Sequence, residues 1–247
     1  MRAAPVRPGP HDAVLFDLDG VLTATAALHA RAWKATLDPV LARWQRRIRR
    51  VQRPFDMGDY VAHVDGKSRC DGVRDFLRAR GVDAPEGGPD SPPEEWSVHG
   101  IANRKQALVD RALRRDWIGA FPGSVRYVRH LRAAGVRTAV VSSSTNCGEV
   151  LRAAEIAGLF ELTVDGNDVA ALGLRGKPAP DGFLEAARRL GVAPERAVVV
   201  EDALGGVRAG HASGFGLVIG VARGAGHADL RGAGADVVVD YLVEFVP

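Results

Sequence analysis

The sequence predicts an α/β fold, in which a doubly wound parallel sheet has helices on both faces and carries an inserted helical cap domain. From Phe121 onward, short apolar runs alternate with segments of helical periodicity, which is typical of a parallel sheet covered by helices. The first apolar run ends near Leu18, and roughly a hundred residues of helical pattern separate it from the next one. Because an insertion of that length cannot be a loop, we expect a separate domain there.

The expected core domain comprises residues 1–24 and 122–247, and the expected cap domain comprises residues 25–121. Strands in the core are expected close to residues 13–18, 138–141, 162–164, 197–200, 216–219 and 236–239. Helices in the core are expected close to residues 124–134, 147–157, 181–190 and 203–213. Asp165 and Asp168, on either side of Gly166, are interpreted as turn residues.

In the cap, a helical pattern starts near Ala26 and continues to about Val51, and we expect Pro39 to divide it into two helices. Residues 60–69 are expected to form a loop or short turn, and residues 83–93 an exposed loop. Further helices are expected at about 71–80 and 98–115. The chain is expected to leave the cap between about Trp117 and Pro122, close to where it entered, which makes a natural hinge.

Composition excludes several classes of protein. The 247 residues are 46% hydrophobic and 26% charged, which argues against disorder, and no apolar run is long enough to cross a bilayer. Residues 1–10 contain arginine and proline without an apolar segment, so we interpret them as a ragged leader and not as a signal peptide. The two cysteines, Cys70 and Cys147, suggest neither a disulfide framework nor a metal site. We therefore expect a cytoplasmic protein with no membrane partner.

Basic residues are numerous, but their pattern favours a solvated surface over a nucleic-acid site. The formal net charge is only +3, although the pI is near 9.1. A cluster of arginines spreads around much of one helix and is accompanied by no nucleic-acid motif: Arg43, Arg46, Arg47, Arg49, Arg50 and Arg53. We expect no nucleic-acid partner, and a nucleic-acid-binding protein remains the non-enzymatic alternative.

The chemistry begins where the first apolar run ends in two carboxylates, Asp17 and Asp19, followed by Gly20. Alternate residues of an extended chain share a face, so both carboxylates start on the same side. Their repulsion is tolerable if a divalent cation lies against Asp17 or if one of the two stays protonated. On its own, the pair could be a strand end followed by a turn aspartate.

Polar residues also follow three later apolar runs, and in a parallel sheet these strand ends meet at one edge. Glu201 and Asp202, with Asp17, are hard oxygen ligands of the kind that Mg²⁺ prefers. Ser142 and Lys177 could hold phosphate oxygens, and Ser143 and Asn146 could bind phosphate or cap the following helix. Asp17 could then act as a nucleophile and Asp19 as a general acid and base.

At this point the chain resembles the haloacid dehalogenase superfamily, and its β-phosphoglucomutase-like branch in particular. The resemblance is carried by four ordered motifs: Asp17-Leu-Asp19-Gly20-Val-Leu-Thr23, Ser142, Gly176-Lys177-Pro178-Ala-Pro180-Asp181, and Val200-Glu201-Asp202-Ala-Leu-Gly-Gly206-Val. It implies that Asp17 is the nucleophile and Asp19 the general acid/base. Ser142 and Lys177 would hold phosphate, and the Mg²⁺ ligands would be Asp17, the Asp19 backbone, Glu201 and Asp202.

The resemblance extends into the cap. Thr25, His29 and Trp33 fit the pattern that follows the first motif, and Arg69 and Lys105 resemble cap residues that bind the distal phosphate and the sugar. Simpler interpretations stand beside these roles: His29 could be packed, Arg69 could pair with Asp71 or Asp75, and Lys105 could be solvated. Asp65 stands where sugar-phosphate mutases of this branch commonly carry lysine, and a carboxylate there would repel a second phosphate.

We therefore expect a Mg²⁺-dependent phosphotransferase that acts on a small-molecule sugar phosphate, with β-phosphoglucomutase as the leading hypothesis and a monomer as the favoured state. The alternative is a phosphatase of sugar phosphates or other small phosphate esters. A haloacid dehalogenase ranks lower, because it needs neither Asp19 nor the Glu201-Asp202 pair.

Overall fold

The computed structural model describes residues 11–115 and 118–247, so the expectations for residues 1–10 and for Trp117 lie outside the described residues. The chain divides into two compact units. The core unit is Met1–Thr25 with Ile118–Pro247, and the cap unit is Ala26–Trp117. Thr25 and residues 118–121, which were expected in the cap, therefore group with the core unit.

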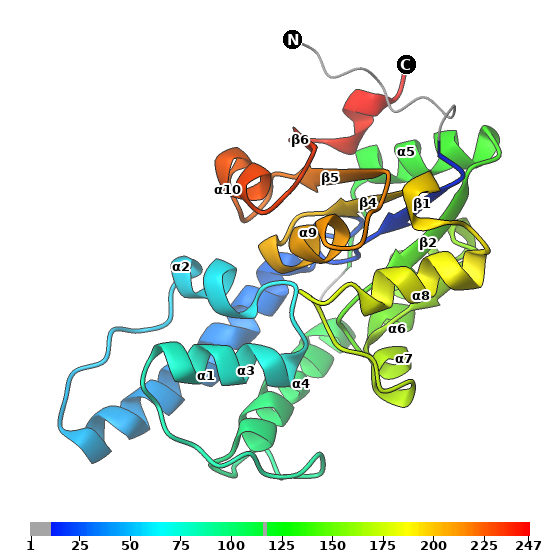
Figure 1. Cartoon of the computed structure of the whole chain (residues 1–247). Helices are drawn as coiled ribbons and strands as arrows, with labels where there is room; N and C mark the ends of the chain where they lie inside the picture. The colour runs from blue at the N-terminus through cyan, green and yellow to red at the C-terminus, as the bar shows by residue number, and fades with distance from the viewer. Residues whose placement is uncertain (1–10, 116–117) are drawn as a thin grey trace. The chain divides into compact units, whose positions relative to one another are not determined.

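The core unit contains a six-stranded sheet in which every neighbouring pair is parallel. Its strands are β1 (Ala13–Phe16), β2 (Arg137–Val141), β3 (Leu162–Val164), β4 (Ala197–Glu201), β5 (Leu217–Val221) and β6 (Val237–Val239). The order is β3-β2-β1-β4-β5-β6, which places β1 between β2 and β4 (Figure 1). The strand order reverses beside β1, and ligands of open α/β sheets bind at the carboxyl ends of strands at such a point.

Helices cover both faces of this sheet, because alternate residues of its strands are apolar on both sides. On one face, Leu15 packs in a cluster with Phe183 of α8 (Asp181–Leu190) and Ala209 of α9 (Leu204–His211). On the other face, the Phe16 ring meets Tyr127 of α5 (Pro122–Ala133) edge to face, with 6.1 Å between ring centroids. The doubly wound arrangement predicted from the sequence is confirmed.

Several short elements of the core unit differ from the predicted boundaries. The helix expected over 147–157 is α6 (Cys147–Ala153), because Glu155 adopts a left-handed φ of 56° and interrupts it before a 3-10 turn, η2 (Ala157–Leu159). Asp165 does not belong to a simple turn: it caps α7 (Gly166–Ala171), with its side chain accepting from Asn167 N and Asp168 N. The remaining elements are η3 (Pro194–Arg196), α10 (His227–Gly232) and η4 (Leu242–Phe245).

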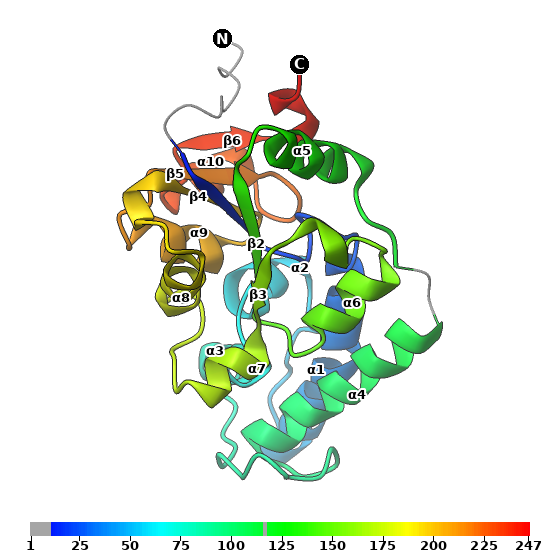
Figure 2. The same cartoon turned by 90° about the vertical axis from the view of Figure 1, so that its right-hand side faces the viewer.

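The cap unit is helical throughout its regular structure. It contains α1 (Ala26–Ile48), α2 (Met57–Asp59), a π-helical turn η1 (Tyr60–Val64), α3 (Arg69–Ala79) and α4 (Val98–Arg115). Within this unit, α1 and α4 lie side by side (Figure 2). Residues 60–69 were expected to form a loop or short turn, and η1 is such a turn in their first half. Among the helices of the two described segments, none combines the length and hydrophobicity that a bilayer-spanning helix needs.

The predicted break at Pro39 was also wrong, because α1 continues through it. A proline inside a helix removes one backbone hydrogen bond and costs about 3 kcal/mol. Leu37, Val40 and Leu41 on either side of it are at most 2% exposed in the cap core. Burial of three large side chains, each worth about 1.5–3 kcal/mol, outweighs that cost.

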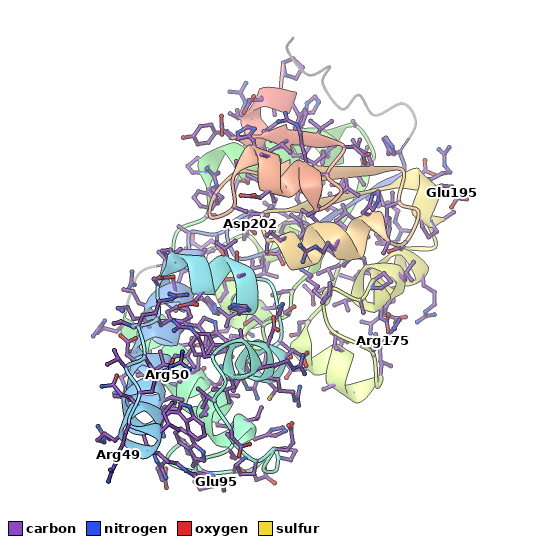
Figure 3. The ribbon with its side chains drawn as sticks, turned by 60° about the vertical axis from the view of Figure 1, so that its left-hand side comes forward. Arg49, Arg50, Glu95, Arg175, Glu195 and Asp202 are labelled. Carbon is purple, nitrogen blue, oxygen red and sulfur yellow. The ribbon has the colours of Figure 1, made fainter. Side chains whose placement is uncertain are left out.

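The arginine-rich end of α1 is exposed, as expected for a solvated helix. Arg49 and Arg50 follow the helix and point outward (Figure 3). Two others cover aromatic rings: the Arg43 guanidinium lies 4.6 Å from the centroid of Trp96, and that of Arg47 lies 5.5 Å from Trp44. Stacking of this kind is an ordinary way to pack arginine on a protein surface.

Candidate active site

The site in the core unit is built around Asp17, which directly follows β1 and is 6% exposed. Its backbone N–H donates to Val200 O at 2.9 Å, which continues the β1–β4 pairing by one residue. Lys177 approaches Asp17 from the loop before α8, and its Nζ lies 2.5 Å from Asp17 Oδ1 and 2.6 Å from Glu201 Oε1. A residue far away in the sequence thus ties the ends of β1 and β4 together.

The Lys177 side chain is fully enclosed. Its Nζ also donates to Val141 O at 3.0 Å and lies 4.9 Å from the centroid of the Phe183 ring. Burial by itself lowers the pKa of the Lys177 ammonium, but the carboxylates of Asp17 and Glu201 outweigh burial and raise its pKa above the usual value. Lys177 is therefore a permanent cation at this site.

Glu201 is 0% exposed at the end of β4. Its Oε2 accepts from the backbone N–H groups of Asp202 and Ala203, both at 3.0 Å. Burial raises the pKa of Glu201 above its usual range, although the ammonium of Lys177 opposes this rise. A Cβ on Gly206 would lie 1.7 Å from Glu201 Oε1, so only glycine leaves room for this carboxylate.

Asp202 lies between β4 and α9 and is 3% exposed (Figure 3). Gly20, in the loop after β1, has φ +91°, and a Cβ there would lie 1.9 Å from Asp202 Oδ2. The glycine is therefore required twice, by its backbone conformation and by the close approach of the carboxylate.

Asp17, Glu201 and Asp202 can each offer one carboxylate oxygen, and these oxygens lie within 4.8 Å of one another. Three hard, anionic oxygen donors in a small buried space fit Mg²⁺ well. The two backbone N–H groups occupy both lone pairs of Glu201 Oε2, and Lys177 occupies one of Oε1, so Oε1 keeps a lone pair for a metal ion. Of the four predicted metal ligands, these three are brought together, and ligation by the Asp19 backbone carbonyl stays a prediction.

Asp19 lies in a loop that doubles back on itself. Thr23 N and Thr23 Oγ1 both donate to Leu18 O, at 3.0 and 3.2 Å, and Gly20 N donates to Thr23 O at 2.9 Å. The hydroxyl of Thr25 donates to Asp19 Oδ1 and also lies 2.8 Å from Thr23 Oγ1. Thr25, predicted as a binding residue, is thus a buried partner of the predicted general acid/base.

The loop after β2 carries the predicted phosphate-binding serine. Ser142 is 3% exposed, and its backbone N–H donates to Val164 O at 3.0 Å. Its Oγ accepts from Ser144 N at 3.1 Å, which fixes the turn that contains Ser143. Asn146 occupies the N-cap position of α6 without a side-chain cap hydrogen bond. The Asn146 side chain therefore does not cap α6, and phosphate binding by Asn146 stays a prediction.

Three predicted residues of the cap unit form one cluster. Lys105 is only 6% exposed, so the interpretation as a solvated lysine was wrong. Its Nζ lies 2.9 Å from His29 Nδ1 and 5.2 Å from the centroid of the Trp33 ring. Burial, and then the nearby charge of Lys105, hold the pKa of His29 well below its usual range, so the imidazole is neutral and can accept from the ammonium.

Arg69, the remaining predicted cap residue, is the first residue of α3, and Ser68 caps that helix. The carboxylates considered as its partners have other ones: Asp71 accepts from Arg74 at 2.6 Å, and Asp75 accepts from Lys67. Sequence reasoning missed the Phe183 ring beneath Lys177, which is an ordinary core residue in the sequence. Thr23 stands in the first motif, but no role was predicted for its hydroxyl, whose contacts only the folded chain reveals.

Comparison with known proteins agrees with this geometry. The family model described as haloacid dehalogenase-like hydrolase matches residues 11–214. The chain is 48% identical over 238 residues to a β-phosphoglucomutase of Mycobacterium bovis, covering 95% of this chain and 91% of that protein. It is 32% identical over 203 residues to hexitol phosphatase A of Escherichia coli, covering 81% and 78%.

Among solved structures, CbbY of Rhodobacter sphaeroides in complex with phosphate is similar, with 28% identity and a TM-score of 0.69 over 96% of each chain. The similarity therefore includes both units. The relatives of this chain are enzymes that transfer phosphoryl groups or hydrolyse phosphate esters. This chain therefore has a phosphoryl-transfer or phosphatase role. We conclude that the chain is an enzyme of the haloacid dehalogenase-like hydrolase family, on its β-phosphoglucomutase-like branch.

Proposed function

We propose that this enzyme is a Mg²⁺-dependent phosphotransferase for a sugar phosphate, and specifically a β-phosphoglucomutase that converts β-glucose 1-phosphate to glucose 6-phosphate. The observation that carries the proposal is the Asp17 carboxylate, buried beside Lys177 and two further carboxylates at the end of β1. The 48% identity to a β-phosphoglucomutase over nearly the whole chain supports the choice of reaction.

In the proposed mechanism, a carboxylate oxygen of Asp17 attacks phosphorus and an aspartyl phosphate forms. The P–O bond to the sugar breaks, and the leaving oxygen takes the proton carried by Asp19. In the reverse half of the cycle, Asp19 takes the proton of a sugar hydroxyl, whose oxygen attacks the phosphorus and releases Asp17. Lys177 offsets the negative charge on the phosphoryl oxygens throughout.

Asp17, Glu201 and Asp202 would hold the Mg²⁺ ion, with the Asp19 backbone carbonyl as a further ligand. The bound ion would supply charge neutralisation between the phosphate and the carboxylates. Ser142, Ser143 and Asn146 would bind phosphate from the loop after β2. In the cap unit, the sugar and its distal phosphate would be bound by neutral His29, the Lys105 cation, Trp33 and Arg69. Thr25 would hold Asp19.

We further propose that the core unit carries catalysis and the cap unit carries substrate specificity, and that the enzyme works as a cytoplasmic monomer without nucleic-acid or membrane partners. Both units would be needed for transfer to a sugar hydroxyl, because the cap must keep water from the aspartyl phosphate.

A phosphatase of small phosphate esters is the second candidate, and two observations favour it. Hexitol phosphatase A is 32% identical to this chain. Asp65 also places a carboxylate where mutases of this branch commonly carry lysine. In a phosphatase, water in place of the sugar hydroxyl would release Asp17 from its phosphate.

One assay separates the two candidates. The protein is incubated with β-glucose 1-phosphate, Mg²⁺ and a trace of the 1,6-bisphosphate, and glucose 6-phosphate and free phosphate are both measured. A mutase yields glucose 6-phosphate with little free phosphate, whereas free phosphate without glucose 6-phosphate identifies a phosphatase. The Asp17→Asn variant should form neither product, and activity in that variant would contradict the nucleophile assignment.

A further inference from the structure

Arg223 makes a contact with the catalytic loop that none of the motifs includes. It follows β5 by two residues, at the same edge of the sheet as Asp17 and Glu201. Its Nε donates to the backbone carbonyl of Gly20 at 3.3 Å. Gly20 is buried and follows Asp19 directly, so this hydrogen bond fixes the Gly20-Val21 peptide, one residue beyond the proposed general acid/base.

The guanidinium of Arg223 lies over two aromatic rings. Its Cζ lies 4.4 Å from the ring centroid of Phe121 and 5.0 Å from that of Tyr241. A cation that contacts two rings loses freedom, which favours one direction for its Nε. Tyr241 is 58% exposed, so this stack lies at the surface and not in the apolar core.

Phe121 belongs to the second of two chain segments that run between the cap unit and the body of the core unit. Within the core unit these segments pair with each other: Ala24 N donates to Gly119 O at 3.0 Å, and Phe121 N donates to Leu22 O at 2.8 Å. Arg223 therefore contacts the first segment through Gly20 and the second through the Phe121 ring.

We propose that Arg223 is a positioning residue that holds the Gly20-Val21 peptide and the paired segments in the arrangement needed for proton transfer by Asp19. It acts on Asp19 through the Gly20 carbonyl. This inference rests on the proposed function, because it assigns Asp19 the role of general acid/base.

Three substitutions separate the hydrogen bond from the stack. Gln carries an N–H group at the same number of bonds from Cα as Arg Nε, so Arg223→Gln keeps the donor and loses the stacked cation. Arg223→Lys keeps a cation for the rings but has a methylene at the Nε position. Arg223→Met removes both features at similar length. Arg196→Met, at the opposite edge of the sheet, is the matched control for loss of a surface arginine.

The expected result is a fall in kcat of about tenfold for Arg223→Met, the size of one lost hydrogen bond in the transition state, with KM changed less than about twofold. Arg223→Gln should restore kcat to within about threefold of wild type, and Arg223→Lys should not. Hydrogen exchange should quicken in Arg223→Met for the amides of residues 22–24 and 119–121, and not for those of β4.

A purely structural role would instead lower the melting temperature of all three variants and leave kcat of the folded protein unchanged, which would overturn the inference. Equal kcat in Arg223→Gln and Arg223→Met would overturn it too. Failure of the proposed function is distinguishable from both results, because the wild type would then be inactive on β-glucose 1-phosphate, whereas hydrogen exchange still reports whether Arg223 holds the paired segments.

Discussion

The ammonium of Lys177 lies between two buried carboxylates, and this arrangement explains how three acidic side chains can be enclosed together. An ionised carboxylate is costly to bury unless it is paired and hydrogen-bonded. Asp17 and Glu201 share the Lys177 cation, and Glu201 also accepts two backbone N–H groups. The Lys177 charge that allows Asp17, the proposed nucleophile, to be buried is also the charge that a phosphoryl group would meet.

Replacing Lys177 by Met should therefore destabilise the protein by about 3 kcal/mol, because it leaves buried carboxylates without their cation. The variant should also gain more thermal stability from Mg²⁺ than the wild type gains, since the ion then binds a cluster of higher negative charge. Melting temperatures in EDTA and in Mg²⁺ measure both effects. Arg175→Met is the control, because its partner Asp181 lies at the surface. Equal Mg²⁺ gains in Lys177→Met and wild type would contradict the shared site.

Gly20→Ala should abolish activity, because the new Cβ would lie 1.9 Å from Asp202 Oδ2 and displace this carboxylate. Gly135→Ala is a matched control: Gly135 also has a positive φ, +78°, but a Cβ there has open space. Both variants pay about 1–2 kcal/mol for the left-handed conformation. Only Gly20→Ala should lose phosphoryl transfer, as measured by kcat of the folded protein, and an active Gly20→Ala would argue against Asp202 as a site residue.

At the residue scale, sequence reasoning found Asp17, Glu201 and Asp202 because they stand at or just after strand ends, and parallel strands end at one edge. It could not find what depends on three-dimensional contact between unrelated segments. Lys105 looked solvated because its helix is polar in sequence, yet the His29 and Trp33 side chains enclose it. Arg223 carries no motif, and only the path of the loop after β1 brings Gly20 to it.

At the scale of elements, long periodic segments were predicted well and short ones poorly. The helix α4 coincides with its predicted range, whereas α7 and α10 have six residues each and leave too little periodicity to detect. The continuity of α1 through Pro39 shows the opposite limit. The tendency of proline to interrupt a helix was outweighed by burial of the neighbouring side chains. The sequence alone does not reveal how deeply those side chains are buried.

The segment between α1 and α3 is held by one buried carboxylate. Asp59 is 2% exposed; it accepts from Arg53 Nη2 at 2.8 Å and from Arg80 Nη2 at 2.6 Å. Burial by itself raises the pKa of Asp59, but hydrogen bonds from Arg80, Asp56 N and Arg53 hold it below its usual value. A carboxyl whose folded pKa is lowered stabilises the protein above its unfolded pKa, and this stability is lost as the pH falls through the folded pKa.

Asp59→Asn should therefore lower the free energy of unfolding by about 3 kcal/mol at pH 7, where the Arg80 guanidinium, whose side chain is only 10% exposed, loses its anion. The difference from wild type should shrink as the pH falls below about 4, the usual pKa of an aspartate, and vanish only below the lowered folded pKa, where Asp59 of the wild type is also neutral. Urea unfolding at several pH values measures it. Asp56→Asn, which removes an exposed partner of Arg53, should cost less than about 1 kcal/mol. A difference that does not depend on pH would refute the electrostatic explanation.

At the scale of the whole molecule, the chain comprises two units joined at two places, and the proposed sugar-phosphate preference would depend on residues of both. The division could be predicted because a helical pattern interrupts the strand pattern after Leu18. Substrate identity could not, because in the proposed function it would depend on a few polar side chains of the cap, such as Asp65 in the loop between η1 and α3.

The charge of Asp65 gives the last prediction. This loop also contains Lys67, which pairs with Asp75, and it ends at Arg69, the predicted ligand of the distal phosphate. Asp65→Lys replaces a repulsive charge by an attractive one, and a single charge pair in water is worth about 1 kcal/mol, or roughly a fivefold change in affinity. The KM for the 1,6-bisphosphate should fall by at least about fivefold. The KM for a phosphate monoester that carries no second charged group should change little.

The ratio of glucose 6-phosphate to free phosphate should rise in Asp65→Lys, because a bisphosphate that stays bound can return its second phosphoryl group to Asp17. Asp83→Lys, the same change in an exposed loop of the cap unit, should leave the ratio as it is in wild type. An equal rise in both variants would show that net charge, and not the loop before Arg69, sets the partition. No rise in either would mean that a carboxylate at residue 65 is compatible with the mutase reaction.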